Sequence, residues 1–310
     1  MPADRIRRED GQILVIFAIA LVAIMGMVGL VLDGGGAFAQ RRDEQNVADM
    51  AALAAANDYL INNSVDLARA RARTVASNNG YTHGDIGVRV DVTFDTSNGV
   101  TANVSITAPH HNSFASVIGM STWSVGATAA ALAGFPDSAA GANPFIFSAS
   151  IFGTNGQPQA QFADPDHPFV FGEGNGDVPN NPNDFSWTNY GTGNLDTTQV
   201  DGIIQGTLVI NKTLTFGEYI GQKNAGFHNP LFVDVNTYLS GTDVPVPVVD
   251  VNGYFQGWST FHIVSADAGS SKTVTGYFRT DYTSPNLTVS ICAAGSCPRY
   301  LGTYVLKLVD

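Results

Sequence analysis

Three stretches of the chain hold residues whose types and spacing are suited to chemistry. Asp164-Pro-Asp166-His167 offers the carboxylate and imidazole groups that bind transition metals. The acidic loop 172–184, GEGNGDVPNNPND, is rich in the oxygen ligands that Ca²⁺ prefers. Cys292 and Cys297 are separated by four residues, which suits a disulfide at a hairpin tip in an oxidising compartment.

Solvated turns are the expected state of the two acidic stretches. Prolines flank Asp166-His167, and loop 172–184 has neither the EF-hand spacing nor the calcium β-roll repeat. Two thiolates are too few for a structural zinc site. The sequence therefore predicts no metal and no cofactor, with calcium in 172–184 left open. We find no Gly-x-Ser-x-Gly, His-Glu-x-x-His or phosphate-binding loop, and we predict no catalytic residue.

The first element along the chain that could help position these stretches is an apolar run near the N-terminus. Ile13–Leu32 holds 20 consecutive residues without a charge, enough for a helix to cross the roughly 30 Å hydrocarbon core of a bilayer. We predict a transmembrane helix at 12–32, with residues 1–11 in the cytoplasm. Arginines flank the run on both sides, so charge alone hardly sets the orientation. We place the C-terminal part outside because it is typical of an exported domain.

A cleaved signal peptide is the main alternative for this run. The small residues at 34–39 would suit a cleavage site, but a signal peptide has a shorter apolar core of roughly 7–15 residues. We expect an uncleaved anchor, with Asp33 hydrated at headgroup level and the glycines 34–36 allowing the next helix to change direction.

Charge is distributed unevenly. The chain carries a formal net charge of −12, and residues 90–310 contribute 6 Lys/Arg against 17 Asp/Glu, a net of −11. An acidic region repels phosphate backbones, so nucleic acid is excluded as a partner.

Residues 33–134 combine a helical pattern with alternating strands. A helix is expected from Gln40 to Asn79, broken at Asn62-Asn63 and restarted with Ser64 as its cap. Its small-residue stripe covers either its own sheet, which we favour, or a helix of another subunit. The stripe consists of Val47, Met50, Ala51, Ala54 and Asn57. After the helix we predict a hairpin at 88–106, a short helix at 112–120 and a strand at 121–133.

A linker is predicted at 135–142, and an acidic β-rich domain at 143–310. Short apolar runs separated by turns indicate a sandwich-like all-β domain, and no helical period is convincing there. Its aromatic residues form either the core or a binding face for glycan or protein. They are Phe185, Trp187, Tyr190, Tyr254, Phe255, Trp258 and Phe261. The predicted fold class is therefore α+β.

The first 134 residues resemble the Tad/Flp pilus-assembly proteins of the TadE/TadG-like class. The resemblance rests on a Gly before the span, an Asp-Gly pair after it, and a Gln ahead of an alanine-rich block. In this chain these are Gly11, Asp33, Gly34, Gln45, Ala48, Asp49, Ala51, Ala52, Leu53 and Ala54. The segment NSFASVIGMSTWSVGATAAA is also similar to the family's Phe-x-x-x-x-Gly segment and the strand after it.

The resemblance implies a bacterial inner-membrane protein with a single span, an extracytoplasmic C-terminal part and no catalysis. Its implied partners are the lipid bilayer, through 12–32, and other Tad/Flp pilus-assembly proteins. Two features depart from the pattern: Ile16 replaces the Glu of processed pilins, and Asp267-Ala-Gly-Ser270-Ser271 lacks the first Ser of a metal-dependent adhesion motif. The rival hypothesis is a secreted adhesin or glycan-binding protein released after cleavage near 34–39; a hydrolase is the weakest of the three.

Overall fold

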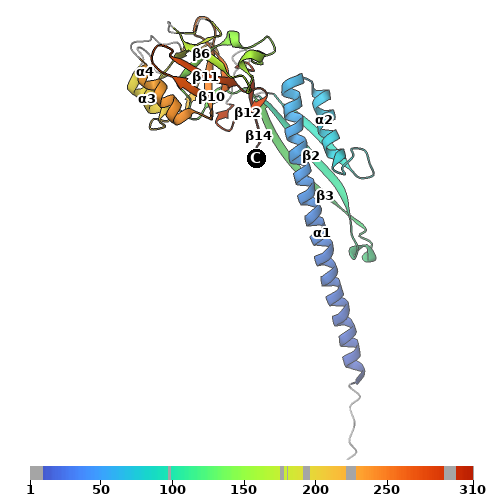
Figure 1. Cartoon of the computed structure of the whole chain (residues 1–310). Helices are drawn as coiled ribbons and strands as arrows, with labels where there is room; N and C mark the ends of the chain where they lie inside the picture. Colours follow the sequence, from blue (N-terminus) through green and yellow to red (C-terminus); the bar gives the residue numbers. More distant parts are fainter. Residues whose placement is uncertain are drawn as a thin grey trace, which may run out of the picture. The chain divides into compact units, whose positions relative to one another are not determined.

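The computed structural model describes residues 10–96, 99–174, 178–179, 181–190, 196–220, 228–289 and 298–309. The chain divides into two compact units (Figure 1). The first comprises residues 1–94, 102–131 and 308–310, and the second comprises 95–101 and 132–307.

The first unit is organised by one long helix, α1 (Asp10–Asn62), which runs through the predicted span and on into the folded part. The three glycines at 34–36 lie inside this helix and do not redirect it, contrary to our expectation. Each glycine costs roughly 1 kcal/mol relative to Ala in a helix interior, but only a residue such as proline removes a hydrogen bond and forces a break. The helix ends where predicted, and Asn63 follows in a left-handed conformation with φ 49°.

The second helix, α2 (Val65–Asn78), begins at Ser64, whose hydroxyl accepts a hydrogen bond from the Leu67 N–H. It packs on α1, and it buries Ala68, Ala72 and Ala76 at i, i+4 spacing. Alanine has no side chain beyond Cβ, so two helices lined by it can approach closely.

Three neighbouring strands complete the first unit: β1 (Arg89–Asp95), β2 (Val100–His111) and β3 (Thr122–Gly134). The expected alternation is present, since Val90, Val92, Val104 and Ile106 are buried. A single short 3₁₀ helix, η1 (Ala115–Ile118), joins β2 to β3 where we expected a short helix.

The second unit contains a closed six-stranded barrel rather than the sandwich we expected. Around the barrel the strands follow the order β10-β11-β6-β7-β5-β9, so β9 closes on β10. They are β5 (Phe145–Ser148), β6 (Phe169–Glu173), β7 (Asp184–Trp187), β9 (Thr242–Val249), β10 (Phe255–Asp267) and β11 (Thr273–Phe278). Closure leaves no free strand edge, which a pattern of short apolar runs does not reveal.

Aromatic rings fill the barrel. Phe147 lies within 4.9–5.2 Å of the rings of Phe171, Phe261 and Phe278, centroid to centroid. Of the two tryptophans that we considered for a binding face, Trp187 is 3% exposed and Trp258 is fully buried. Both therefore belong to the core.

The second unit also contains helices that the sequence pattern did not predict. These are α3 (Thr197–Ile204), capped by the Asp196 carboxylate, α4 (Asn229–Asp234) and the π-helical turn η4 (Val235–Leu239). They are too short for a helical period to be evident. Residues 135–142, for which we predict a linker, contain β4 (Ser138–Ala139), which pairs with β8 (Lys212–Thr213) and β13 (Leu287–Thr288). The remaining strands are β12 (Tyr282–Thr283) and β14 (Thr303–Val309), which pair in parallel.

Candidate functional site

Asp33 fastens the β2–β3 connection to α1. Its Oδ1 accepts a hydrogen bond from Ser113 N at 2.8 Å, and its Oδ2 accepts from Ala115 N at 2.7 Å and Phe114 N at 3.0 Å. The side chain is only 4% exposed, so the hydrated carboxylate that we expected is wrong. The three N–H groups belong to the start of η1, whose amides have no partner within the short helix, and a carboxylate is a strong acceptor for them.

One face of α1 is shaped to receive this connection. Gly29, Asp33, Gly36 and Gln40 follow at i, i+4, i+7 and i+11, which places them on the same side of the helix. A Cβ on Gly29 would lie 2.6 Å from the Phe114 Cβ, and one on Gly36 would lie 2.9 Å from His110. Glycine is therefore required at both positions for the close approach. Gly34 has open space around it and is under no such constraint.

Farther along α1, two glutamine side chains make polar contacts with the helix itself and with strands β2 and β3. The Gln40 amide N–H group donates to Glu44 at 2.8 Å and its oxygen contacts His110 Nδ1 at 2.9 Å. One turn further along α1, Gln45 donates to Asp49 Oδ1 and to the carbonyl of Thr128 on β3, both at 2.9 Å. Gln45 thus ties the helix to the sheet that it covers.

Glu44, the acceptor of the Gln40 amide, is fully buried. Its Oε2 atom has no hydrogen-bond partner among the described residues. Burial raises the pKa of this carboxyl against the hydrogen bond from Gln40, which lowers it. Next to it, the Tyr81 hydroxyl donates to Asp43 Oδ2 at 2.7 Å, and burial together with that contact raises the Tyr81 pKa well above its ordinary value.

The alanine-rich block packs inside the first unit, although its buried face differs from the predicted one. Met50 is 45% exposed, while Leu53, Ala54 and Asn57 are only partly buried. The residues that are buried are Val47, Ala48, Ala51, Ala52, Ala55 and Ala56. This face is wide enough to meet both α2 and the sheet, which favours packing within the chain over packing on another subunit. Asp49 lies at its edge, bound to Gln45, and Gly11 lies in the first turn of α1.

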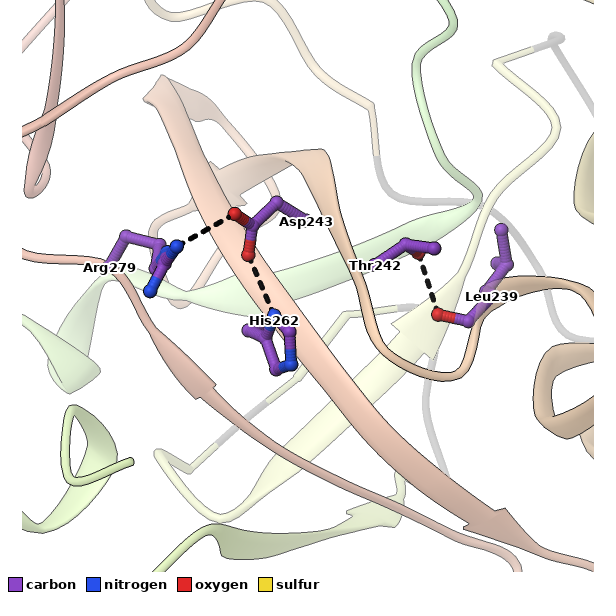
Figure 2. Close-up of polar contacts among 5 residues, drawn as sticks. All are labelled: Leu239, Thr242, Asp243, His262 and Arg279. Atoms are coloured by element: carbon purple, nitrogen blue, oxygen red, sulfur yellow. Dashed lines mark hydrogen bonds and ion pairs between the residues drawn. The ribbon is translucent and has the colours of Figure 1, made fainter. Parts of the chain in front are cut away.

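In the second unit, a row of polar side chains crosses three barrel strands. Asp243 on β9, His262 on β10 and Tyr277 on β11 are successive cross-strand partners. Figure 2 shows the Asp243 carboxylate between an imidazole and a guanidinium: Oδ1 lies 2.8 Å from His262 Nδ1 and Oδ2 lies 3.0 Å from the Arg279 guanidinium. The His262 ring stacks on Tyr277 at 4.8 Å. Because the carboxylate is paired on both sides and the imidazole is stacked, the row is suited to holding strands together.

A second polar group lies deep in the same unit. Glu173 accepts a hydrogen bond from Trp187 Nε1 at 2.9 Å and pairs with His228, which is 1% exposed. Lys272 lies 3.7 Å from the other Glu173 oxygen. Trp187 and His228 thus lie at Glu173 Oε1 and Lys272 lies near Oε2, and a buried carboxylate requires polar partners of this kind.

In the stretches that suggested metal chemistry, the described carboxylate and amide side chains bind neighbouring residues of their own segment. The Asp164 carboxylate accepts from the backbone of Asp166 and contacts His167 Nδ1 at 3.0 Å, and the His167 contact is the first cause of its lowered pKa. In loop 172–184, Asn181 accepts from Asn183 N at 2.9 Å and donates to Asp184. Within the described residues no group of three or more His, Cys, Asp or Glu could hold a metal ion. Cys292 and Cys297, the predicted disulfide, lie outside the described residues.

Sequence reasoning missed the partners of Asp33. We identified Asp33 and Gly34 as a pair, whereas the structure joins Asp33 with Gly29, Gly36 and the η1 amides. The spacing Gly29-x₃-Asp33-x₂-Gly36 is a helical i, i+4, i+7 pattern, and it could have indicated a shared face. Nothing in the sequence marked residues 113–115 as its partner.

Comparison with known proteins matches one part of the chain. Neither the curated proteins nor the solved structures include a significant match to it. Residues 11–58, which comprise nearly all of α1, match the family described as "Putative Flp pilus-assembly TadE/G-like". These residues include the apolar run, Asp33, Gln45 and the alanine block, as the resemblance predicted. Residues 11–58 of this chain are therefore similar to the TadE/G-like Flp pilus-assembly family.

Proposed function

We propose that this protein is a membrane-anchored, extracytoplasmic structural component for the assembly of a bacterial Tad/Flp pilus or a related secretion apparatus, without catalysis. The observation that carries the proposal is that the TadE/G-like segment coincides with one continuous helix, apolar at its start and packed into a folded unit further on.

The apolar start of α1 has the properties of a lipid-exposed span. Its large side chains, from Ile13 to Leu32, are between 44% and 72% exposed. Leaving that much apolar surface in water is unfavourable, and the core helix of a soluble protein would bury it. The helix is long and apolar enough to cross a membrane. A bilayer therefore accounts for this surface better than water does.

The proposed orientation keeps residues 1–11 in the cytoplasm and 33–310 outside. Support comes from the acidic charge of residues 90–310 and from the paired cysteine spacing, which suit an exported region. The outer 30 residues of α1, from Asp33 to Asn62, extend about 45 Å at 1.5 Å per residue. A stiff helix of this length gives a membrane protein a platform outside the bilayer on which other assembly proteins can bind.

The test begins with the native protein, recovered separately from membranes and culture supernatant of the bacterium that encodes it. Intact mass and N-terminal sequencing are expected to give a membrane-bound chain that starts near Met1. A soluble chain starting after Asp33 would overturn the anchored role and favour the released adhesin. Such cleavage would fall inside α1 beside the buried Asp33 side chain, so the structure offers no exposed loop for it.

The assembly role needs a genetic readout. Deletion of the gene is expected to reduce surface Flp pili seen by electron microscopy, and the full-length gene supplied in trans should restore them. Wild-type numbers of pili in the deletion strain would contradict the assembly role, whatever the fractionation shows.

A further inference from the structure

The loop between β2 and β3, residues 112–121, is exposed and apolar although it lies outside the span. We call it the foot loop. Its apolar side chains are Phe114, Val117, Ile118 and Met120, which are 44%, 85%, 76% and 57% exposed. No Asp, Glu, Lys or Arg occurs between Asn112 and Pro136, in a chain with a net charge of −12. Four neighbouring exposed hydrophobic side chains with no charge among them indicate an interaction surface.

The foot loop lies beside the apolar run of α1. The Phe114 Cβ occupies the space that a side chain on Gly29 would need, and Gly29 belongs to the run that ends at Leu32. Three residues of helix correspond to about 4.5 Å along the axis. Phe114 therefore contacts α1 about 4–5 Å inside the apolar boundary, and Figure 1 shows the loop at the lower end of β2 and β3, beside α1.

The backbone of the foot loop is prepared for a medium without water. Asp33 accepts the N–H groups of Ser113, Phe114 and Ala115. The remaining turn is closed internally: Val117 N donates to Phe114 O, Gly119 N to Ser116 O, Met120 N to Ala115 O, and the Asn112 side chain to Met120 O. Unpaired backbone groups are costly in an apolar environment, and here the Asp33 carboxylate and the turn pair the N–H groups of Ser113, Phe114, Ala115, Val117, Gly119 and Met120.

We propose that the foot loop inserts Phe114, Val117, Ile118 and Met120 into the leaflet facing residues 33–310, as a second membrane contact beside the span. This rests on the proposed anchoring of α1. A lipid surface fits better than a protein partner because the loop continues the exposed apolar surface of the span at the same depth. An apolar face reaching roughly 5–10 Å into the headgroup and acyl boundary is typical of interfacial segments. Trp123, just beyond the loop and half-buried beside His110, is a residue type enriched at that boundary.

The second contact has a mechanical consequence for the anchor. A single helix can rotate about its axis and tilt in a bilayer. A foot loop inserted on one side of α1 fixes the rotation, because turning the helix would pull four apolar side chains into water. The folded unit would thereby be held in one orientation on the membrane surface.

The test places a photoreactive residue in the full-length protein, reconstituted into vesicles of phosphatidylethanolamine and phosphatidylglycerol. The variant Val117→p-benzoylphenylalanine probes the foot loop, and Ile118→p-benzoylphenylalanine repeats the test at a second exposed site. Two matched controls use exposed apolar residues of the same unit: Val22, 69% exposed in the span, and Ile86, 97% exposed in the turn after Tyr81. Lipid adducts are identified by mass spectrometry after illumination.

Lipid adducts are expected at positions 117, 118 and 22, and none at 86. Adducts at 22 without adducts at 117 or 118 would overturn the inserted foot loop and leave the anchor intact. Adducts to a second protein copy at 117, in place of lipid, would also overturn it. No lipid adduct at 22 would contradict the anchor itself, and with it the proposed function.

Discussion

Enlarging one alanine of α2 tests whether the TadE/G-like alanine block serves the fold of its own chain. Ala72 is fully buried in the helix pair, between Ala68 and Ala76. The facing helix buries Ala48, Ala51, Ala52, Ala55 and Ala56, which have no flexible side chain that could move aside. Ala72→Leu adds three carbons where the backbones approach closely, and overpacking of this kind costs about 1–3 kcal/mol.

The cost appears as faster amide exchange in α2. In the full-length protein in lipid nanodiscs, hydrogen exchange of peptides covering 65–78 reports local opening of this helix. A loss of about 1–3 kcal/mol corresponds to exchange roughly 5- to 150-fold faster. Barrel peptides, such as those covering 242–249, should exchange at unchanged rates.

The matched control is Ala70→Leu, on the exposed side of the same helix. A surface change of this kind is worth about 0.5 kcal/mol or less, which is roughly twofold in exchange rate. Equal effects of the two variants, or wild-type exchange in Ala72→Leu, would refute close packing of α1 on α2. The alanine block would then be available to another subunit, which is the alternative that the sequence left open.

Three further changes test single contacts. Asp33→Ala should accelerate hydrogen exchange of the amides of residues 113–115 because it removes their acceptor, whereas Asp66→Ala, at an exposed position, should not. Unchanged exchange in Asp33→Ala would mean that water replaces the carboxylate with no loss of stability. Burial raises the Glu44 pKa, so the stability that this carboxyl contributes is full below its ordinary pKa near 4.5 and is lost as pH rises through the raised pKa. Glu44→Gln should therefore slow the hydrogen exchange of α1 at pH 7 but not at pH 4. Equal effects at the two pH values would contradict a raised pKa. Asp243→Asn weakens both pairs shown in Figure 2 and should lower barrel stability in urea by about 1 kcal/mol by tryptophan fluorescence, whereas Asp267→Asn, exposed at the end of β10, should have no effect.

The elements of the first unit could be predicted because each has a strong local signal. The uncharged apolar run, the Ser64 cap and the alternation around Val90 and Val104 depend on neighbouring residues only, and the structure confirms each of them. The glycines at 34–36 misled the prediction of a bend. Local propensity disfavours them in a helix, but the helix is continuous through them, with Gly36 close to His110 and Asp33 bound to the β2–β3 connection.

The barrel could not be predicted from the same signals. Strand positions such as 273–278 follow from alternation, but closure depends on which strands become neighbours, and β5 pairs in parallel with β9 across about a hundred residues of sequence. No local pattern encodes that choice. The candidate site was limited in the same way: Asp33 was visible as a charge at the end of an apolar run, whereas its partners come from a distant connection.

The distance along the chain between Asp33 and its partners has a consequence for biosynthesis. The carboxylate and the first amide that it accepts are 80 residues apart. At a synthesis rate of about 5–20 residues per second, that separation corresponds to roughly 4–16 s between the emergence of the two. During this interval the ionised side chain stands at the end of an already synthesised apolar helix and has only water as its partner. The charge can limit how far that helix inserts into lipid until residues 113–115 have been synthesised. Asp33 would then first oppose further insertion and afterwards accept the hydrogen bonds of the β2–β3 connection in the finished fold.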